Sequence, residues 1–255
     1  MDAELVCDIL LFFATSSERD ALQDAAKQRG IPFHRKSHPA LGRFYWMDKI
    51  GDYRVNAVRT EMGPLSYGGS ASQAIFFKSA TEASSIIQLG MAFGTIPSRQ
   101  QPGDVLVSRS IIPYDRRDIR TEGESYLVNY SPAQRHPARP SLLRIFEQER
   151  DRGGHPYHVH IGAMLSGGAR IHSRHFRDEL VSLIPAPGDE IIGGEMEGVG
   201  LLSVSPLLDP VWVVVKGISD FADKDRDTVI EQNRPIACRN AADLVLRALL
   251  NADHA

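Results

Sequence analysis

Three stretches of this sequence carry carboxylates at places where a protein of alternating strands and helices collects its polar groups. Asp220 directly follows the apolar run VWVVVKGIS, Glu18 lies just beyond the apolar run LVCDILLFFA, and Glu197 lies in GGEMEG. Ligands of open α/β sheets bind at the carboxyl ends of strands. A poorly solvated carboxyl group at such an edge has a raised pKa, which suits a general acid near neutral pH. The pattern alone equally allows Asp220 to cap a turn and Glu197 to be a surface helix residue.

Apolar runs of strand length alternate with segments of helical period, which predicts an α/β fold. Ser16 or Ser17 is expected to cap the first helix, and Gly30 to end it. Two strands that flank Gly51 and Asp52 indicate an antiparallel hairpin. The other predicted helices are 70–81, SLLRIFEQERD, HFRDELVSLI, 193–204 and 234–250, and the other predicted strands are SSIIQLG, DVLVSRSIIPY, HVHIGAMLSG and VWVVVKGIS.

These elements predict one domain over residues 1–255, a three-layer sandwich with a mixed central β-sheet flanked by helices. The stretch from Asp115 to Pro140 is polar and rich in Arg, Pro and Ser. It is predicted as a long loop, which would serve as a lid, a binding loop or a subunit contact.

The composition excludes several classes of protein. A formal net charge of −3 leaves no excess of cations to neutralise nucleic-acid phosphates. Cys7 and Cys238 are too few for a disulfide framework or a zinc site, and they indicate a reducing compartment. The sequence shows neither a signal peptide nor an apolar run long enough to span a membrane. We therefore expect a cytoplasmic protein that binds neither nucleic acid nor membrane, with no metal and no cofactor.

Two motifs resemble a known family. GGEMEGVGLLSV followed by PVWVVVKGISDFAD is similar to the signature of the superfamily of purine nucleoside phosphorylases and methylthioadenosine/S-adenosylhomocysteine nucleosidases. MGPLSYGGSASQAI, IIQLGMAFG, QPGDVLVSRSIIPYD and LSGGARI resemble further family segments in the same order, so the resemblance covers nearly the whole chain. It implies a nucleoside phosphorylase-like fold, a homodimer or higher homo-oligomer, and cleavage of the N-glycosidic bond of a purine, adenine-type nucleoside or nucleotide.

The resemblance also assigns roles to residues. Such bonds break through an oxocarbenium-like sugar, and the purine leaves as a neutral base. Asp220, supported by Ser219, would protonate the base, and Glu197 would hold the ribose hydroxyls. Met196 and Glu195 would lie beside Glu197 at the sugar. The base-binding residues that the resemblance implies are Ser219, Arg170, Ile171, Phe221 and Met91.

The nucleophile separates two branches of this family. Phosphorylases carry an Arg and a Ser or Thr that hold phosphate, and here Gln88 and Met91 stand at those positions. Glu18 occupies the position of the carboxylate that activates water, and Lys216 stands where an Arg orients it. The sequence therefore favours hydrolysis. Phosphorolysis stays an alternative because Arg19 could bind an anion, and a catalytically silent nucleotide-sensing domain is the alternative from another class.

The substrate's identity is left open by the base-binding segment. Arg170 replaces an aromatic residue of the family and could stack on a purine or hold a phosphate. With His172, Arg174 and His175 it forms a basic cluster that is either solvated surface or a site for a charged 5′ substituent. The second reading predicts a nucleotide such as AMP or ATP as substrate.

Overall fold

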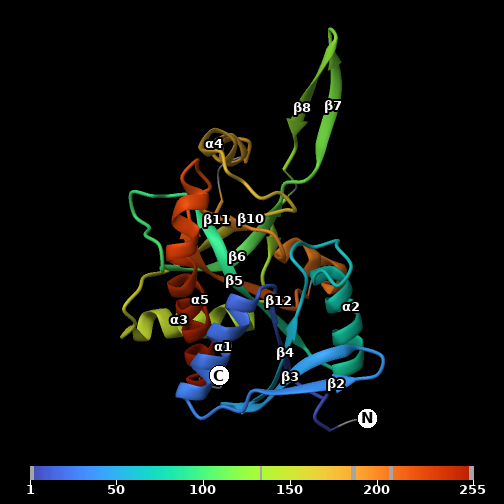
Figure 1. The fold of residues 1–255 in the computed structure, drawn as a ribbon, viewed down its shortest axis with the longest axis vertical. Helices are drawn as coiled ribbons and strands as arrows, with labels where there is room; N and C mark the ends of the chain where they lie inside the picture. The colour runs from blue at the N-terminus through green and yellow to red at the C-terminus, as the bar shows by residue number, and fades with distance from the viewer. Residues whose placement is uncertain (1–2, 133, 185–187, 207–208, 253–255) are drawn as a thin grey trace.

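The computed structural model describes residues 3–132, 134–184, 188–206 and 209–252, and a mixed β-sheet runs through its centre (Figure 1). β1 pairs in parallel with β4 on one side and with β5 on the other, and β5 pairs in parallel with β12. Antiparallel strands β3 and β2 extend one edge. In spatial order the sheet contains β11 (Ile191–Glu195), β10 (Val159–Ser166), β6 (Val105–Pro113), β12 (Trp212–Asp220), β5 (Ser85–Gly94), β1 (Ile9–Phe13), β4 (Tyr53–Arg59), β3 (Gly42–Ile50) and β2 (His34–His38), with β9 (His136–Pro137) beside β6.

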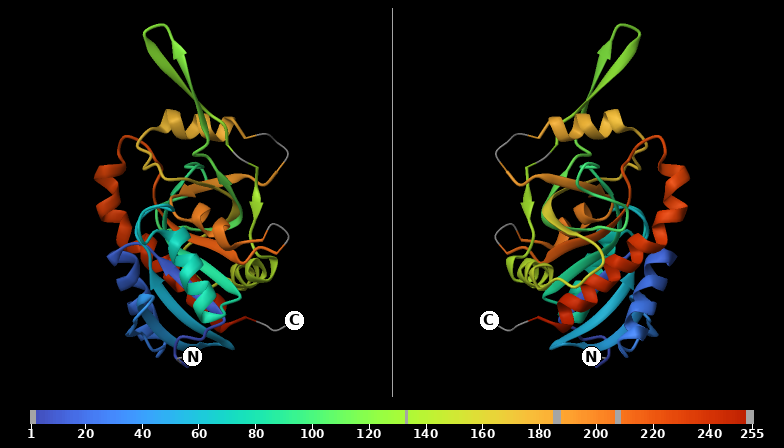
Figure 2. Two further views of the ribbon diagram at one scale, coloured as in Figure 1. Left: turned by 90° about the vertical axis from the view of Figure 1, so that its right-hand side faces the viewer. Right: turned by 90° about the vertical axis from the view of Figure 1, so that its left-hand side faces the viewer.

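Helices cover both faces of this sheet (Figures 1 and 2). On one face α5 packs so closely on β12 that a Cβ at Gly217 would lie 2.0 Å from the Ala237 carbonyl oxygen. On the other face a 3₁₀ helix packs against α2, where a Cβ at Gly200 would lie 2.1 Å from Ser70 Oγ. This confirms the predicted sandwich. The helices are α1 (Ser16–Gln28), α2 (Ser70–Thr81), α3 (Pro140–Arg152), α4 (Arg174–Ser182), α5 (Arg226–Leu250) and the 3₁₀ helix η1 (Gly198–Val204).

The far end of β5 closes part of the sheet into a ring. Phe93 and Gly94 pair antiparallel with Gly194 and Gly193 of β11, so β5, β12, β6, β10 and β11 form a closed ring of paired strands. A Cβ at Gly194 would lie 2.3 Å from the Phe93 ring, and one at Gly193 would lie 2.4 Å from its carbonyl oxygen. The two adjacent glycines therefore allow the backbones of β5 and β11 to approach closely enough to pair.

Three predicted elements were wrong in detail. Residues 193–204 are not one helix: β11 ends at Glu195 and the 3₁₀ helix η1 begins at Gly198. Pairing with β10 and β5 overrides the helical pattern there. α5 begins at Arg226 rather than Arg234 and continues through Pro235. Thr15, not a serine, caps α1 in a capping box with Glu18.

The polar stretch after Asp115 is not a loop. It forms a hairpin of β7 (Arg117–Glu122) and β8 (Ser125–Tyr130), which projects away from the sandwich in both views of Figure 2. Gly123 has a φ of +62° at its turn. Because most of its side chains face solvent, the hairpin lacks the apolar alternation by which strands are recognised. Among the helices of the described residues, none is long and apolar enough to cross a membrane.

Candidate active site

A cavity of about 430 Å³ opens at the carboxyl ends of several strands and along the first turns of α5. Its walls come from segments far apart in the sequence, since β1, β5, β10, β11 and β12 all end beside it. The structure brings together nine of the residues predicted from the sequence: Glu18, Met91, Arg170, Ile171, Glu195, Met196, Glu197, Ser219 and Asp220.

Asp220 is a buried carboxyl group in the wall of this cavity. It is 3% exposed at the end of β12. Its Oδ2 accepts a hydrogen bond from Ser219 Oγ (2.8 Å) and its Oδ1 accepts one from the Ala222 amide (2.9 Å). Burial raises the pKa of Asp220, which outweighs the lowering by these donors and by Arg226, 3.6 Å away. A carboxyl that retains its proton at higher pH is suited to protonate a leaving group.

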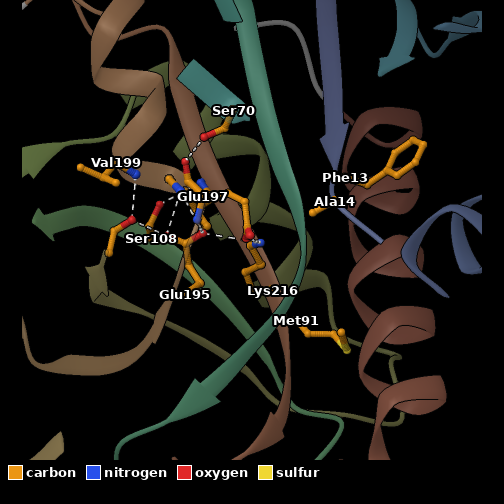
Figure 3. A network of polar contacts seen from close by, with 12 residues as sticks. Phe13, Ala14, Ser70, Met91, Ser108, Glu195, Glu197, Val199 and Lys216 are labelled. Carbon is orange, nitrogen blue, oxygen red and sulfur yellow. Dashed lines mark hydrogen bonds and ion pairs between the residues drawn. The ribbon is translucent and has the colours of Figure 1, made fainter. Parts of the chain in front are cut away.

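Glu195, Glu197 and Lys216 form one buried network (Figure 3). Lys216 Nζ donates to Glu197 Oε2 at 2.8 Å and lies 3.5 Å from Glu195 Oε2. Burial alone lowers the pKa of Lys216, but the neighbouring carboxylates, Glu197 foremost, raise it above its ordinary value. The ammonium therefore stays charged inside the fold. Glu197 Oε1 also accepts from the Gly63 amide at 3.2 Å, so both of its oxygens are fixed.

Glu195 holds the turn that presents Glu197. Its carboxylate accepts from Ser166 Oγ at 2.6 Å and from the amides of Glu197 and Gly198 at 2.9 Å each. Burial raises the pKa of Glu195 even though Lys216 lowers it. These bonds give Glu195 a positioning role for the chain between β11 and η1, rather than a free carboxylate at the sugar.

Glu18 lines the cavity, and backbone amides hold its carboxylate in place. Its Oε2 accepts from the amides of Ala14 (2.7 Å) and Thr15 (2.8 Å), and its Oε1 accepts from the Met91 amide at 3.0 Å. All three contacts are acceptor contacts, as an ionised carboxylate requires. A Cβ at Gly90 would lie 2.2 Å from Glu18 Oε1, so only glycine leaves room for this carboxylate.

Two predicted site residues do not line the cavity. Lys216 hydrogen-bonds Glu197 instead of orienting Glu18 directly, although both lie against Gly90, where a Cβ would be 3.0 Å from Lys216 Nζ. The Phe221 ring packs within 2.8 Å of the position of a Cβ at Gly94, behind the wall. Phe93, rather than Phe221, is the aromatic residue that lines the cavity.

Sequence reasoning missed one whole wall. The first turns of α5 contribute a face whose residues recur at helical spacing, and Met62 also lines the cavity. The predicted helix begins at Arg234 and therefore leaves out residues 226–233. The repeat of charged residues three to four apart was the available signal. The residues of this wall are Arg226, Asp227, Ile230, Glu231 and Arg234.

Lys216→Met is expected to lower the free energy of unfolding by ~3–5 kcal/mol at neutral pH, because two buried carboxylates lose their counter-ion. The loss should shrink on acidification: the raised pKa of Glu195 means that its ionised form opposes folding, and this cost disappears as the group takes up its proton. Urea unfolding at neutral and mildly acidic pH measures both effects. The exposed Lys27→Met on α1 should change stability by under ~0.5 kcal/mol, and an equal loss in both variants would contradict the counter-ion role.

The fold and the cavity define an α/β protein with a carboxylate-lined site for a small molecule. The model of the phosphorylase superfamily matches residues 8–250. The chain belongs to this superfamily.

Two proteins with similar sequences are named nucleosidases. The chain is 24% identical over 205 residues to a 5′-methylthioadenosine/S-adenosylhomocysteine nucleosidase of Haemophilus ducreyi, covering 80% of this chain and 83% of the relative. It is 26% identical over 185 residues to a death domain-containing ATP nucleosidase of Amphimedon queenslandica, covering 64% of this chain. The match spans 33% of that longer relative.

Solved structures share the fold. A 5′-methylthioadenosine/S-adenosylhomocysteine nucleosidase of Neisseria meningitidis has a TM-score of 0.75 at 19% identity, covering 95% of this chain and 98% of that chain. Futalosine hydrolase of Helicobacter pylori has a TM-score of 0.74 at 17% identity, covering 98% of this chain and 99% of that chain.

Proposed function

We propose that this chain hydrolyses the N-glycosidic bond of a purine nucleoside or nucleotide with an adenine-type base. The observation that carries the proposal is one cavity lined by a buried Asp220 with a raised pKa and by two further carboxylates, Glu197 and Glu18. Relatives named nucleosidases and hydrolases support it. Those names differ in what the 5′ carbon bears, a methylthio group in one and a triphosphate in another.

The leaving base would be protonated by Asp220. As the bond between C1′ and N9 breaks, its electron pair passes to the purine, and a proton from Asp220 neutralises N7. Ser219 donates to the same carboxyl and holds its orientation. Ile171 and Phe93 offer apolar surface to a purine, and Arg170 lies at the rim beside Met62.

The sugar would be held by Glu197, whose charge stabilises a developing oxocarbenium ion. Met196 lines the cavity next to it and can pack on the ribose. Glu18 would accept a proton from the water that attacks C1′. The three amides that hold Glu18 fix the direction of its carboxylate, which favours a base over a mobile surface group.

A phosphate nucleophile finds little support in this cavity. Gln88 stands where a phosphorylase would place its Arg, yet it is fully buried in β5 and does not line the cavity. Neither amide atom of Gln88 has a hydrogen-bond partner within the described part of the chain. Met91 offers a backbone amide, which Glu18 already occupies. Water is therefore the better nucleophile.

Product analysis tests the proposal. The protein is incubated with adenosine, AMP, ATP and 5′-methylthioadenosine, with and without phosphate, and the products are separated by chromatography. Hydrolysis predicts adenine and an unphosphorylated C1′ hydroxyl at a rate independent of phosphate. A ribose 1-phosphate product would establish the phosphorylase instead. Ligand binding without any base release, unchanged in Asp220→Asn, would establish a sensing domain.

We further infer a cytoplasmic homo-oligomer built from one catalytic domain per chain. The β7–β8 hairpin supports association because Ile119, Tyr126 and Leu127 are 66%, 68% and 45% exposed. Tyr130 instead packs on Phe176 of its own chain, with ring centroids 4.8 Å apart. Sedimentation of the protein with this hairpin's apolar residues changed to serine tests the contact. The buried free cysteines Cys7 and Cys238 support a reducing compartment.

A further inference from the structure

We propose that the substrate carries a phosphate ester on its 5′ carbon, bound by Arg234 of α5 beside the N-terminus of α1. This inference rests on the proposed function and names the substrate class of the same site. It makes the protein a hydrolase of nucleotides, whose products are adenine and a ribose 5-phosphate or 5-polyphosphate.

The position of the 5′ group follows from the other contacts. A base that meets Asp220 and ribose hydroxyls that meet Glu197 leave the 5′ carbon to face the remaining wall. That wall runs along α5 from Arg226, 3.6 Å from Asp220, to Arg234, eight residues and about 12 Å further along the helix. Arg226, Ile230 and Arg234 share this face because they are four residues apart.

Arg234 contributes an unsatisfied hydrogen-bond donor to this wall. Its Nε is buried and has no hydrogen-bond partner among the residues that the structure describes. Arg226, by contrast, lies 3.6 Å from Asp220 and 3.4 Å from Asp227. A buried N–H donor without an acceptor is costly, and an anion bound to this half-buried side chain removes that cost. Phosphate is suited to this role because a guanidinium can bind two of its oxygens at once.

The N-terminus of α1 strengthens the same subsite. Thr15, the N-cap residue, lines the cavity with Arg234. The first amides of a helix lack intrahelical acceptors, and the helix dipole favours an anion there. Thr15 Oγ1 and Glu18 satisfy two of the donors around this cap, while Ser16 and Ser17 head the helix. The Glu18 carboxylate already offsets much of the positive charge at this cap, so the attraction for a 5′ phosphate comes mainly from Arg234, and α1 adds backbone donors.

The charges of the wall favour a phosphate over an amino-acid tail. Glu231 and Asp227 also line the cavity, and a substituent that carries an amine could pair with them. Both of these side chains are exposed, so water solvates them without a ligand. Asp227 also faces Arg226 and His172. The group that gains most from a ligand is therefore the buried Nε of Arg234.

Arg234→Gln tests the subsite. Values of kcat/KM are measured for AMP, ATP, adenosine, 5′-methylthioadenosine and S-adenosylhomocysteine through the release of adenine. We expect the wild type to prefer AMP or ATP, and the ratio of kcat/KM for the nucleotide to that for adenosine to fall roughly 10–100-fold in Arg234→Gln. Arg239→Gln, an exposed change on the same helix and outside the cavity, should leave that ratio unchanged.

Failure of this inference and failure of the proposed function give different results. Base release from uncharged nucleosides or S-adenosylhomocysteine alone keeps the function and overturns the phosphate subsite. An equal loss for all substrates in Arg234→Gln overturns it as well. If no compound loses its base, the proposed function falls, and calorimetric titration decides the subsite: ATP must bind more tightly than adenosine, with the difference abolished in Arg234→Gln, and equal affinities overturn it.

Discussion

Asp220→Asn is expected to slow base release ~10²–10⁴-fold while ligand affinity stays nearly unchanged, because an amide cannot give up the proton that the leaving purine needs. The substitution should preserve the fold. The amide oxygen still accepts the hydrogen bond that Ala222 donates, and the side chain keeps its size. Single-turnover release of adenine, together with calorimetric binding of the same substrate, measures the two quantities separately. Near wild-type turnover in this variant would remove Asp220 from the role of acid.

The pH dependence of base release by the wild type tests the role of Asp220 a second time. Burial raises the pKa of Asp220, and only the protonated form can donate. Base release should therefore fall as the pH rises through that raised pKa, and the corresponding limb should be absent from the residual activity of Asp220→Asn. Asp24→Asn, an exposed change on α1, should keep both the rate and the limb.

The catalytic carboxylates could be predicted because each follows a strand whose composition is unambiguous. The runs before Glu18 and Asp220 are buried at every position of β1 and β12, and the carboxyl ends of parallel strands meet at one edge. Family resemblance then supplied the roles. The direct partner of Lys216 could not be read this way, since it depends on how the turn after β11 brings Glu197 back over the sheet.

The misassigned elements share a physical cause. Residues 193–204 are predicted as one helix, but Gly193 and Gly194 pair with Gly94 and Phe93 of β5 instead. At the C-terminal end the predicted helix begins at Arg234, whereas α5 begins at Arg226 and includes Pro235. In both places tertiary packing outweighs local preference. Because the predicted helix leaves out the start of α5, the sequence did not show that Arg226 and Arg234 share one face of the cavity. The nature of the 5′ substituent therefore stayed open.

Glu18→Gln is expected to slow hydrolysis ~10²–10⁴-fold, because the amide cannot take the proton from attacking water. The fold should persist with a loss of ~1–3 kcal/mol: glutamine also serves at this position of a capping box, but its NH2 group then faces the Met91 amide, which loses its acceptor. Adenine release is followed with and without added phosphate, and thermal unfolding monitors the fold. Glu179→Gln, an exposed change on α4, should keep full activity.

This variant also separates the two nucleophiles. Inorganic phosphate attacks C1′ without a general base, so a phosphorylase would need Glu18 only for the helix cap. Retention of phosphate-dependent release in Glu18→Gln would therefore contradict hydrolysis. Loss of release in both buffers, with an unfolding transition that stays well above the assay temperature, would assign to Glu18 the activation of water. The cap and the base are then two functions of one carboxylate, whose Oε2 accepts from the Ala14 and Thr15 amides just before α1 and whose Oε1 lies against Gly90.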